Sequence, residues 1–174
     1  KYEVYWNDLQ LGYHTYPRPI IGSGHDEETW LTSDALILDH PQPHLWSQRH
    51  VVAAASNSGF WPVEIAVKGL YRFDVRRWPK ETNHPISASL QPDLTSDITM
   101  NGKPVQVGNG KAIPVERVRM RVGDQEVEKK IGPQDVSAVF ELDLQPGPNL
   151  VRAWLIDVLG NKQTAYYVYV SLLN

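Results

Sequence analysis

The sequence predicts an all-β fold, an antiparallel β-sandwich or jelly roll. Short segments with period-2 hydrophobic alternation recur along the chain, and turn residues such as Gly160-Asn161 separate them about every ten residues. No segment keeps a helical period for longer than a turn or two. A chain of 174 residues has the size of one domain and can bury about 70% of its unfolded surface, so it needs neither disulfides nor a metal to hold a core.

The first part of the chain has a different character from the rest. Residues 1–28 are predicted to form an extended lead-in that packs on the sandwich, and residues 29–174 are predicted to form the sandwich itself. The lead-in is rich in Tyr and Trp without a sustained period, and Pro17 and Pro19 favour an extended conformation. Ile20-Ile21 is compatible with a short strand that ends in a turn.

The strongest local pattern lies between residues 56 and 86. Two alternating apolar runs, Val63, Ile65, Val67 and then Tyr71, Phe73, Val75, flank the dipeptide Lys68-Gly69. Such a pattern predicts an antiparallel hairpin with one buried face. The same alternation places Arg77 on the core side, where its guanidinium requires a partner such as Glu81 or another acid.

The second half contains clearer strands. Val118, Met120 and Val122 alternate with Arg117, Arg119 and Arg121, and Gly123-Asp124 turns the chain into a segment that carries Glu126 and Glu128. Cross-strand salt pairs on a solvated face are the favoured interpretation of the three arginines. The alternative is a basic strip for a sulfated or carboxylated sugar, because Arg holds such anions through paired hydrogen bonds. Further strands are predicted in residues 138–144, 150–157 and 164–172.

Composition and motifs exclude several classes of chemistry. Because the chain contains no Cys, thiol nucleophiles and thiolate metal sites are excluded. A net charge of -3 gives no reason to expect nucleic acid as a partner, and no apolar stretch approaches the roughly 20 residues of a membrane helix, so membrane insertion is not expected. Nucleophile-elbow and phosphate-loop motifs do not occur, and no pair of acids is singled out for glycoside hydrolysis.

A metal site is the remaining simple hypothesis. Asp39, His40, His44 and His50 occur together in one loop-like segment. The prolines at positions 41 and 43 exclude a helix that would place two of these histidines on one face. Solvated or hydrogen-bonded loop histidines are therefore favoured, and no metal site is predicted.

Residues 69–81, reading GLYRFDVRRWPKE, resemble the C-terminal region of bacterial formylglycine-dependent arylsulfatases, members of the sulfatase family. The shared pattern is G-x-Y-x-F-x-Φ-R-R-W-P-x-E, where Φ is apolar. Residues 57–64, which precede this pattern, carry the resemblance as well. Residues 18–23, 31–34, 46–48, 112–115 and 165–170 are similar to other parts of the same tails, so the resemblance covers most of the chain. Two positions depart from it: Ala35 stands where relatives often have an aromatic residue, and Ser47 replaces an Asn.

The resemblance implies a non-catalytic C-terminal domain of an arylsulfatase that acts on sulfated carbohydrate and is periplasmic or secreted. Its partner would be the catalytic domain, which would supply the calcium and the formylglycine of a sulfuric ester hydrolase. This chain lacks the Cys/Ser-x-Pro-x-Arg motif that becomes formylglycine, so it is not expected to be an enzyme or to hold a cofactor.

An autonomous carbohydrate-binding module is the alternative, because the fold also resembles carbohydrate-binding and galactose-binding-like sandwiches. Its ligand would be a sulfated polysaccharide. Side chains that combine an apolar body with a polar handle suit such a surface. The candidate sugar contacts are Trp46, Gln48, Trp61, Arg77 and Trp78.

Overall fold

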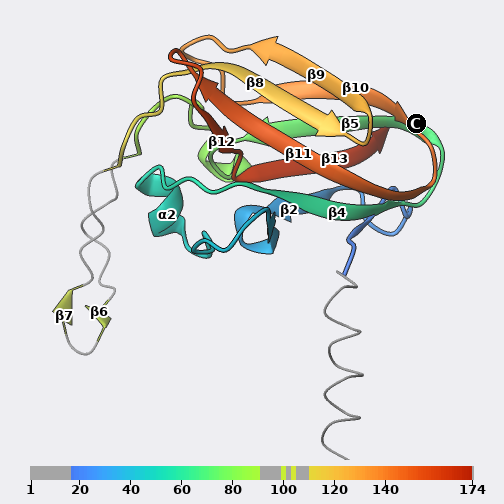
Figure 1. Cartoon of the computed structure of the whole chain (residues 1–174), viewed down its shortest axis with the longest axis horizontal. Coiled ribbons are helices and arrows are strands. Elements are labelled where there is room, and N and C mark those ends of the chain that lie inside the picture. The colour runs from blue at the N-terminus through green and yellow to red at the C-terminus, as the bar shows by residue number, and fades with distance from the viewer. Residues whose placement is uncertain (1–16, 91–98, 101–102, 105–109, 174) are drawn as a thin grey trace, which may run out of the picture.

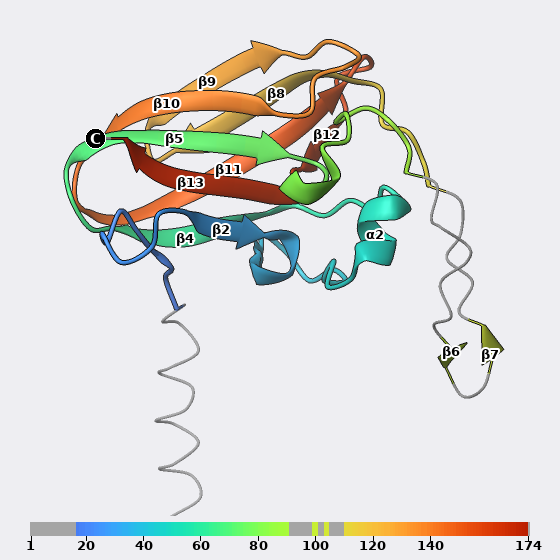
Figure 2. The same ribbon diagram turned by 180° about the vertical axis from the view of Figure 1, so that it is seen from behind.

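Two β-sheets stack face to face in the computed structural model, which describes residues 17–90, 99–100, 103–104 and 110–173. Figures 1 and 2 show one sheet from each side of the sandwich. The larger sheet has the order β1 (Ile20–Ile21), β4 (Gly59–Ile65), β11 (Gly147–Asp157), β8 (Val115–Val122) and β9 (Gln125–Lys130). The smaller sheet has the order β10 (Ala138–Leu144), β5 (Gly69–Arg76), β13 (Tyr167–Leu173) and β2 (Thr29–Thr32). The predicted all-β sandwich is confirmed.

Short elements complete the edges and ends of the two sheets. Strand β12 (Lys162–Thr164) pairs with β11, strand β3 (Ile37–Leu38) pairs with β4, and β6 (Thr99–Met100) pairs with β7 (Lys103–Pro104). The 3-10 turns η1 (Ser33–Ala35) and η2 (Lys80–Thr82) follow β2 and β5. The short helix α2 (Gln48–Val52) lies at one end of the sandwich in both views (Figures 1 and 2).

The core lies between the inner faces of the two sheets. Alternate residues of every long strand point inward, and Val63, Phe73, Met120, Val151 and Val168 are all fully buried. Because successive side chains of a strand point to opposite faces, a period-2 sequence buries one apolar row per strand. The outer faces keep the polar and charged residues that alternate with these rows.

The predicted hairpin over residues 63–75 is wrong. Strand β4 pairs with β11, β1 and β3 in the larger sheet, whereas β5 pairs with β10 and β13 in the smaller one. Residues 66–68 therefore cross from one sheet to the other. A two-residue hairpin needs a residue with positive φ, and neither Lys68 nor Gly69 has one. The predicted rows are still buried within the strands, because each faces the same core from its own sheet, but Val67 lies past the end of β4 and is 43% exposed.

Two other turns do form hairpins. Gly123, with a φ of 57°, joins β8 to β9, and Gly160, with a φ of 83°, joins β11 to β12. Glycine adopts these left-handed conformations without the steric cost of a Cβ. The predicted strands over residues 138–144, 150–157 and 164–172 are confirmed, except that β11 begins three residues earlier, at Gly147, and the last segment is divided between β12, which ends at Thr164, and β13, which begins at Tyr167.

The lead-in reaches the sandwich as a strand. Ile20 and Ile21 form β1, which runs parallel to β4, while β3 pairs with the other end of β4. Pro62 has no N–H and lies between these two paired segments, a position that a strand proline tolerates. Residues 1–16, which hold most of the predicted lead-in, lie outside the described residues, so the boundary at residue 28 stays a prediction.

Among the described helices, none has the length and apolar character needed to cross a membrane.

Candidate functional site

The five predicted sugar-contact residues separate into two groups. Trp46 is 75% exposed and Gln48 is exposed, whereas Trp61, Arg77 and Trp78 are each at most 1% exposed. The two buried indoles also use their only donor, since Trp61 Nε1 donates to the carbonyl of Thr32 at 2.8 Å and Trp78 Nε1 to that of Pro85 at 3.1 Å. The prediction that these three residues contact sugar is corrected, because their buried side chains leave no exposed face on which a sugar could stack.

Arg77 has a structural role instead. It points into the core as the alternation predicts, but it forms no ion pair with any acid in the part of the chain that the structure describes. Its guanidinium donates to the carbonyls of Ala88 at 3.0 Å, Val51 at 3.2 Å and Lys111 at 2.5 Å, and lies 4.3 Å from the centre of the Trp78 ring. Burial lowers the pKa of Arg77 to about 10. The expected ion pair with Glu81 or another acid is thus replaced by carbonyls of helix α2 and of two separate loops.

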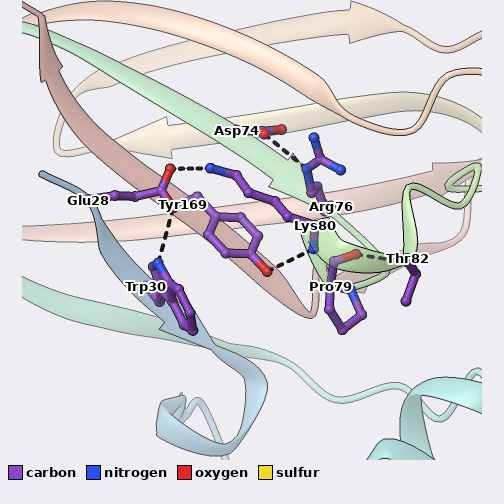
Figure 3. A network of polar contacts seen from close by, with 8 residues as sticks. All are labelled: Glu28, Trp30, Asp74, Arg76, Pro79, Lys80, Thr82 and Tyr169. Carbon is purple, nitrogen blue, oxygen red and sulfur yellow. Dashed lines mark hydrogen bonds and ion pairs between the residues drawn. The ribbon is translucent and has the colours of Figure 1, made fainter.

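The neighbouring residues of the motif fasten β5 to the rest of the smaller sheet, as Figure 3 shows. Arg76 Nε donates to Asp74 at 2.9 Å, and the backbone N–H of Lys80 donates to the Tyr169 hydroxyl at 3.2 Å. The Lys80 ammonium lies 4.5 Å from the centre of the Tyr169 ring and pairs with Glu28. The Arg-Arg-Trp-Pro segment is therefore a structural corner, and its side chains are occupied by the fold.

A polar hollow of about 140 Å³ surrounds the two exposed candidates. It lies where the turn η1, the loop before α2, the first turn of α2 and the start of β13 meet. Ser33 Oγ donates to the carbonyl of Leu45 at 3.1 Å, which holds η1 against the loop. The residues that line it are Ser33, Asp34, Leu45, Trp46, Ser47, Gln48, Val51 and Tyr167.

The polar groups of this hollow surround one exposed indole. The Gln48 amide donates to the Tyr167 hydroxyl, and Asp34 and Ser47 supply a carboxylate and a second hydroxyl. Burial raises the pKa of Tyr167, with the Gln48 hydrogen bond acting in the opposite direction, so its hydroxyl stays a neutral donor and acceptor. An amphipathic ring beside a few such groups is suited to a ligand that has an apolar face and several hydroxyls.

Tyr167 and Asp34 were missed by the sequence analysis. Tyr167 alternates with buried Val168, so its outward orientation follows from the strand period alone. Its ring stacks on that of Tyr169 with centres 6.3 Å apart. Asp34 lies in the segment 31–34 that carries part of the resemblance, but its approach to Trp46 depends on the packing of η1 against a loop that lies later in the chain.

The histidine-rich loop does not assemble a metal centre in the part of the chain that the structure describes. No group of three or more His, Cys, Asp or Glu side chains that could hold an ion occurs among those residues. Asp39 is held by the Arg152 guanidinium through contacts of 2.7 and 2.9 Å and accepts from Ser58 Oγ at 2.5 Å. The Arg152 hydrogen bonds lower the pKa of Asp39 to about 2.

An apolar groove of about 430 Å³ follows the edge of the sandwich between β2 and β4. Trp30, 59% exposed, forms one wall, and its Nε1 donates to Glu28 at 3.0 Å. Pro17, Pro19 and Ile37 also line the groove, so the lead-in reaches the sandwich at this place.

Comparisons with known proteins show no family for this chain. No protein-family model matches it. No curated protein matches it either. Among solved structures, the crystal structure of a ruminal GH26 endo-β-1,4-mannanase aligns with 86% of this chain at 9% identity and a TM-score of 0.40. The alignment spans 26% of the mannanase chain. A similarity this low carries no argument about function.

Proposed function

We propose that this chain is the non-catalytic C-terminal β-sandwich domain of an arylsulfatase that acts on sulfated carbohydrate. The observation that supports the proposal is the structural use of the G-x-Y-x-F-x-Φ-R-R-W-P-x-E pattern. A Cβ at Gly69 would lie 2.6 Å from Leu172. Tyr71 and Phe73 enter the core, and Arg77 joins helix α2 to two loops. A pattern most of whose residues have a distinct structural role is a strong constraint on the fold, so sharing it favours a shared domain.

The proposed partner is the catalytic domain of the same protein. The apolar groove beside Trp30 and the neighbouring Ile20, which is 53% exposed, form the surface that we assign to this contact. Exposed apolar patches of this kind mark surfaces that a partner covers. By the resemblance, the catalytic domain holds the calcium and the formylglycine, and the whole protein is secreted or periplasmic.

The test uses the complete coding sequence that contains this chain. Its product is assayed on 4-nitrophenyl sulfate, and peptide mass spectrometry is used to find formylglycine. We expect turnover from the complete protein, none from residues 1–174 alone, and slower hydrogen exchange at β1 and β2 in the complete protein than in the isolated domain. A coding sequence without a formylglycine motif would refute the proposal.

A second function is favoured by the hollow beside Trp46, namely direct contact with the glycan. The indole is 75% exposed although a tryptophan gains about 2–3 kcal/mol from burial, so its exposure suits a stacking platform. Asp34, Gln48 and Tyr167 lie beside it and can pair with sugar hydroxyls. This role is compatible with a domain that also packs on a sulfatase.

Affinity electrophoresis of the isolated domain in gels that contain sulfated or unsulfated polysaccharides tests this second role. Trp46→Ala should abolish retention, and the matched control Trp30→Ala removes another exposed indole away from the hollow and should keep it. Equal retention by wild type and Trp46→Ala, or loss in both variants, would contradict the assignment to this hollow.

A further inference from the structure

The three arginines of β8 do not share one environment. Arg117 Nη1 lies 3.2 Å from Glu128, and Arg119 lies 2.7 Å from Glu128 and 3.5 Å from Glu126. The Arg119 hydrogen bond lowers the pKa of Glu128, as expected for a carboxylate in such a pair. The cross-strand interpretation is therefore confirmed for these two arginines. Arg121 differs: Glu126 lies directly opposite it on β9 but pairs with Arg119, and the Arg121 side chain forms no ion pair or hydrogen bond with any residue in 17–90 or 110–173.

A second arginine, Arg152, lies next to Arg121 in the sheet. Across β8 and β11, which lie side by side in Figure 1, Arg121 is the direct partner of Arg152. Like charges at directly opposed positions destabilise a sheet. The Arg152 guanidinium is turned toward Asp39, which neutralises it through paired contacts of 2.7 and 2.9 Å. Arg121 keeps its charge without such a partner.

A hollow of about 320 Å³ lies beside these two arginines. Asn149 lines it, and its Oδ1 accepts from the N–H of Leu150 at 2.9 Å, so that its Nδ2 is left as a donor. Gly123, with a φ of 57°, opens the floor of the hollow, because a Cβ there would lie 2.8 Å from Asn149 Oδ1. Asp124 is the one acid among the residues that line the hollow, and it forms no ion pair with Arg121.

We propose that this hollow binds an anionic group of a saccharide, a sulfate ester, with the Arg121 guanidinium and Asn149 Nδ2 as donors. The choice of a saccharide as the carrier rests on the proposed function. A planar guanidinium donates paired hydrogen bonds to oxyanions, and such charge-assisted bonds are about twice as strong as neutral ones. The site lies on the outer face of the larger sheet, separate from the hollow that contains Trp46.

The experiment compares dextran sulfate, carboxymethyl dextran and unmodified dextran as probes, with dissociation constants measured by calorimetry on residues 1–174. Arg121→Gln should weaken binding of dextran sulfate about tenfold, because a charge-assisted hydrogen bond contributes about one such factor. Arg119→Gln is the matched control, since it removes the same charge from the same strand face, and it should change the constant less than about twofold. Asp124→Asn should tighten binding by removing a neighbouring negative charge.

The two arginine variants distinguish a specific anion site from a general effect of surface charge. Equal weakening by Arg121→Gln and Arg119→Gln would show a general charge effect and overturn it, as would an unchanged constant for Arg121→Gln. Tighter binding of carboxymethyl dextran than of dextran sulfate would overturn the choice of a sulfate ester. Because both arginines are solvent-accessible, Arg121→Gln and Arg119→Gln should fold, and their thermal midpoints should stay close to that of the wild type. If Trp46→Ala abolishes retention by unsulfated glycans while Arg121→Gln changes nothing, the glycan-binding role stands and the anion site fails.

Discussion

Arg77 is buried without an acid partner, and the first prediction concerns the stability that its hydrogen bonds supply. Arg77→Met keeps an unbranched side chain of similar length in the core but removes every donor. The carbonyls of Ala88 and Lys111 then lose their donor at a buried site, whereas the Val51 carbonyl keeps the N–H of Ala54 at 3.1 Å. A buried acceptor left unsatisfied costs about 1–3 kcal/mol, which gives about 2–6 kcal/mol for the two. Release of the desolvation cost of the cation offsets the upper part of that sum, so we expect a loss of about 2–4 kcal/mol in the free energy of unfolding.

Urea denaturation followed by tryptophan fluorescence measures this loss, because Trp78 lies 4.3 Å from the guanidinium and reports on the same site. The matched control is Arg72→Met, an exposed arginine of the same strand β5, for which a change within about 0.5 kcal/mol is expected. An Arg77→Met variant whose unfolding free energy stays within 1 kcal/mol of wild type would refute the reasoning. It would mean that the carbonyls find other donors or water.

Three further predictions concern single residues. The pKa of Asp39 is lowered to about 2, so its pair with Arg152 should stabilise the fold above about pH 4 and lose that contribution as the pH falls toward 2. After solvent screening we expect this contribution to be about 1 kcal/mol. It is measured as the difference in unfolding free energy between wild type and Asp39→Asn, which should be present at about pH 7 and largely lost at about pH 2.5. Trp46→Ala should leave the thermal midpoint nearly unchanged and reduce the fluorescence that acrylamide quenches, with exposed Trp30 supplying part of what remains, whereas a midpoint drop of more than a few degrees would show that the indole packs. Gly22→Ala should cost about 2–3 kcal/mol in urea unfolding, because φ is 71° and the new Cβ would lie 2.2 Å from the buried Tyr71 hydroxyl; an unchanged midpoint would contradict this crowding.

The motif that carries the resemblance and the surface that suits a ligand are different parts of the molecule. Arg77 and Trp78 form a buried corner, while Trp46 and Gln48 lie on an exposed hollow at the end of the sandwich. A distinctive sequence pattern is therefore informative about the fold in this chain rather than about the contacts of a ligand. The same separation explains why removing either exposed residue should be tolerated by the fold.

The sequence by itself determined the all-β class, the buried face of each strand and the hairpins at Gly123 and Gly160. These features depend on neighbours within a few residues, through side-chain alternation and the φ that a turn requires. It also placed Arg77 in the core, because the alternation of β5 continues one residue past the strand.

The tertiary structure alone decided which strands pair and which aromatic residues stay exposed. β4 and β5 carry the alternation of a hairpin yet belong to different sheets, because an inward row satisfies the same core from either side. Trp46 and Trp61 are chemically identical, and only the packing of α2 and η1 against β13 leaves the first in water. Likewise, Arg119 and Arg121 each face a glutamate on β9, but on β11 the first lies beside Trp154 and the second beside Arg152, so strands distant in the chain set the charge that surrounds each side chain.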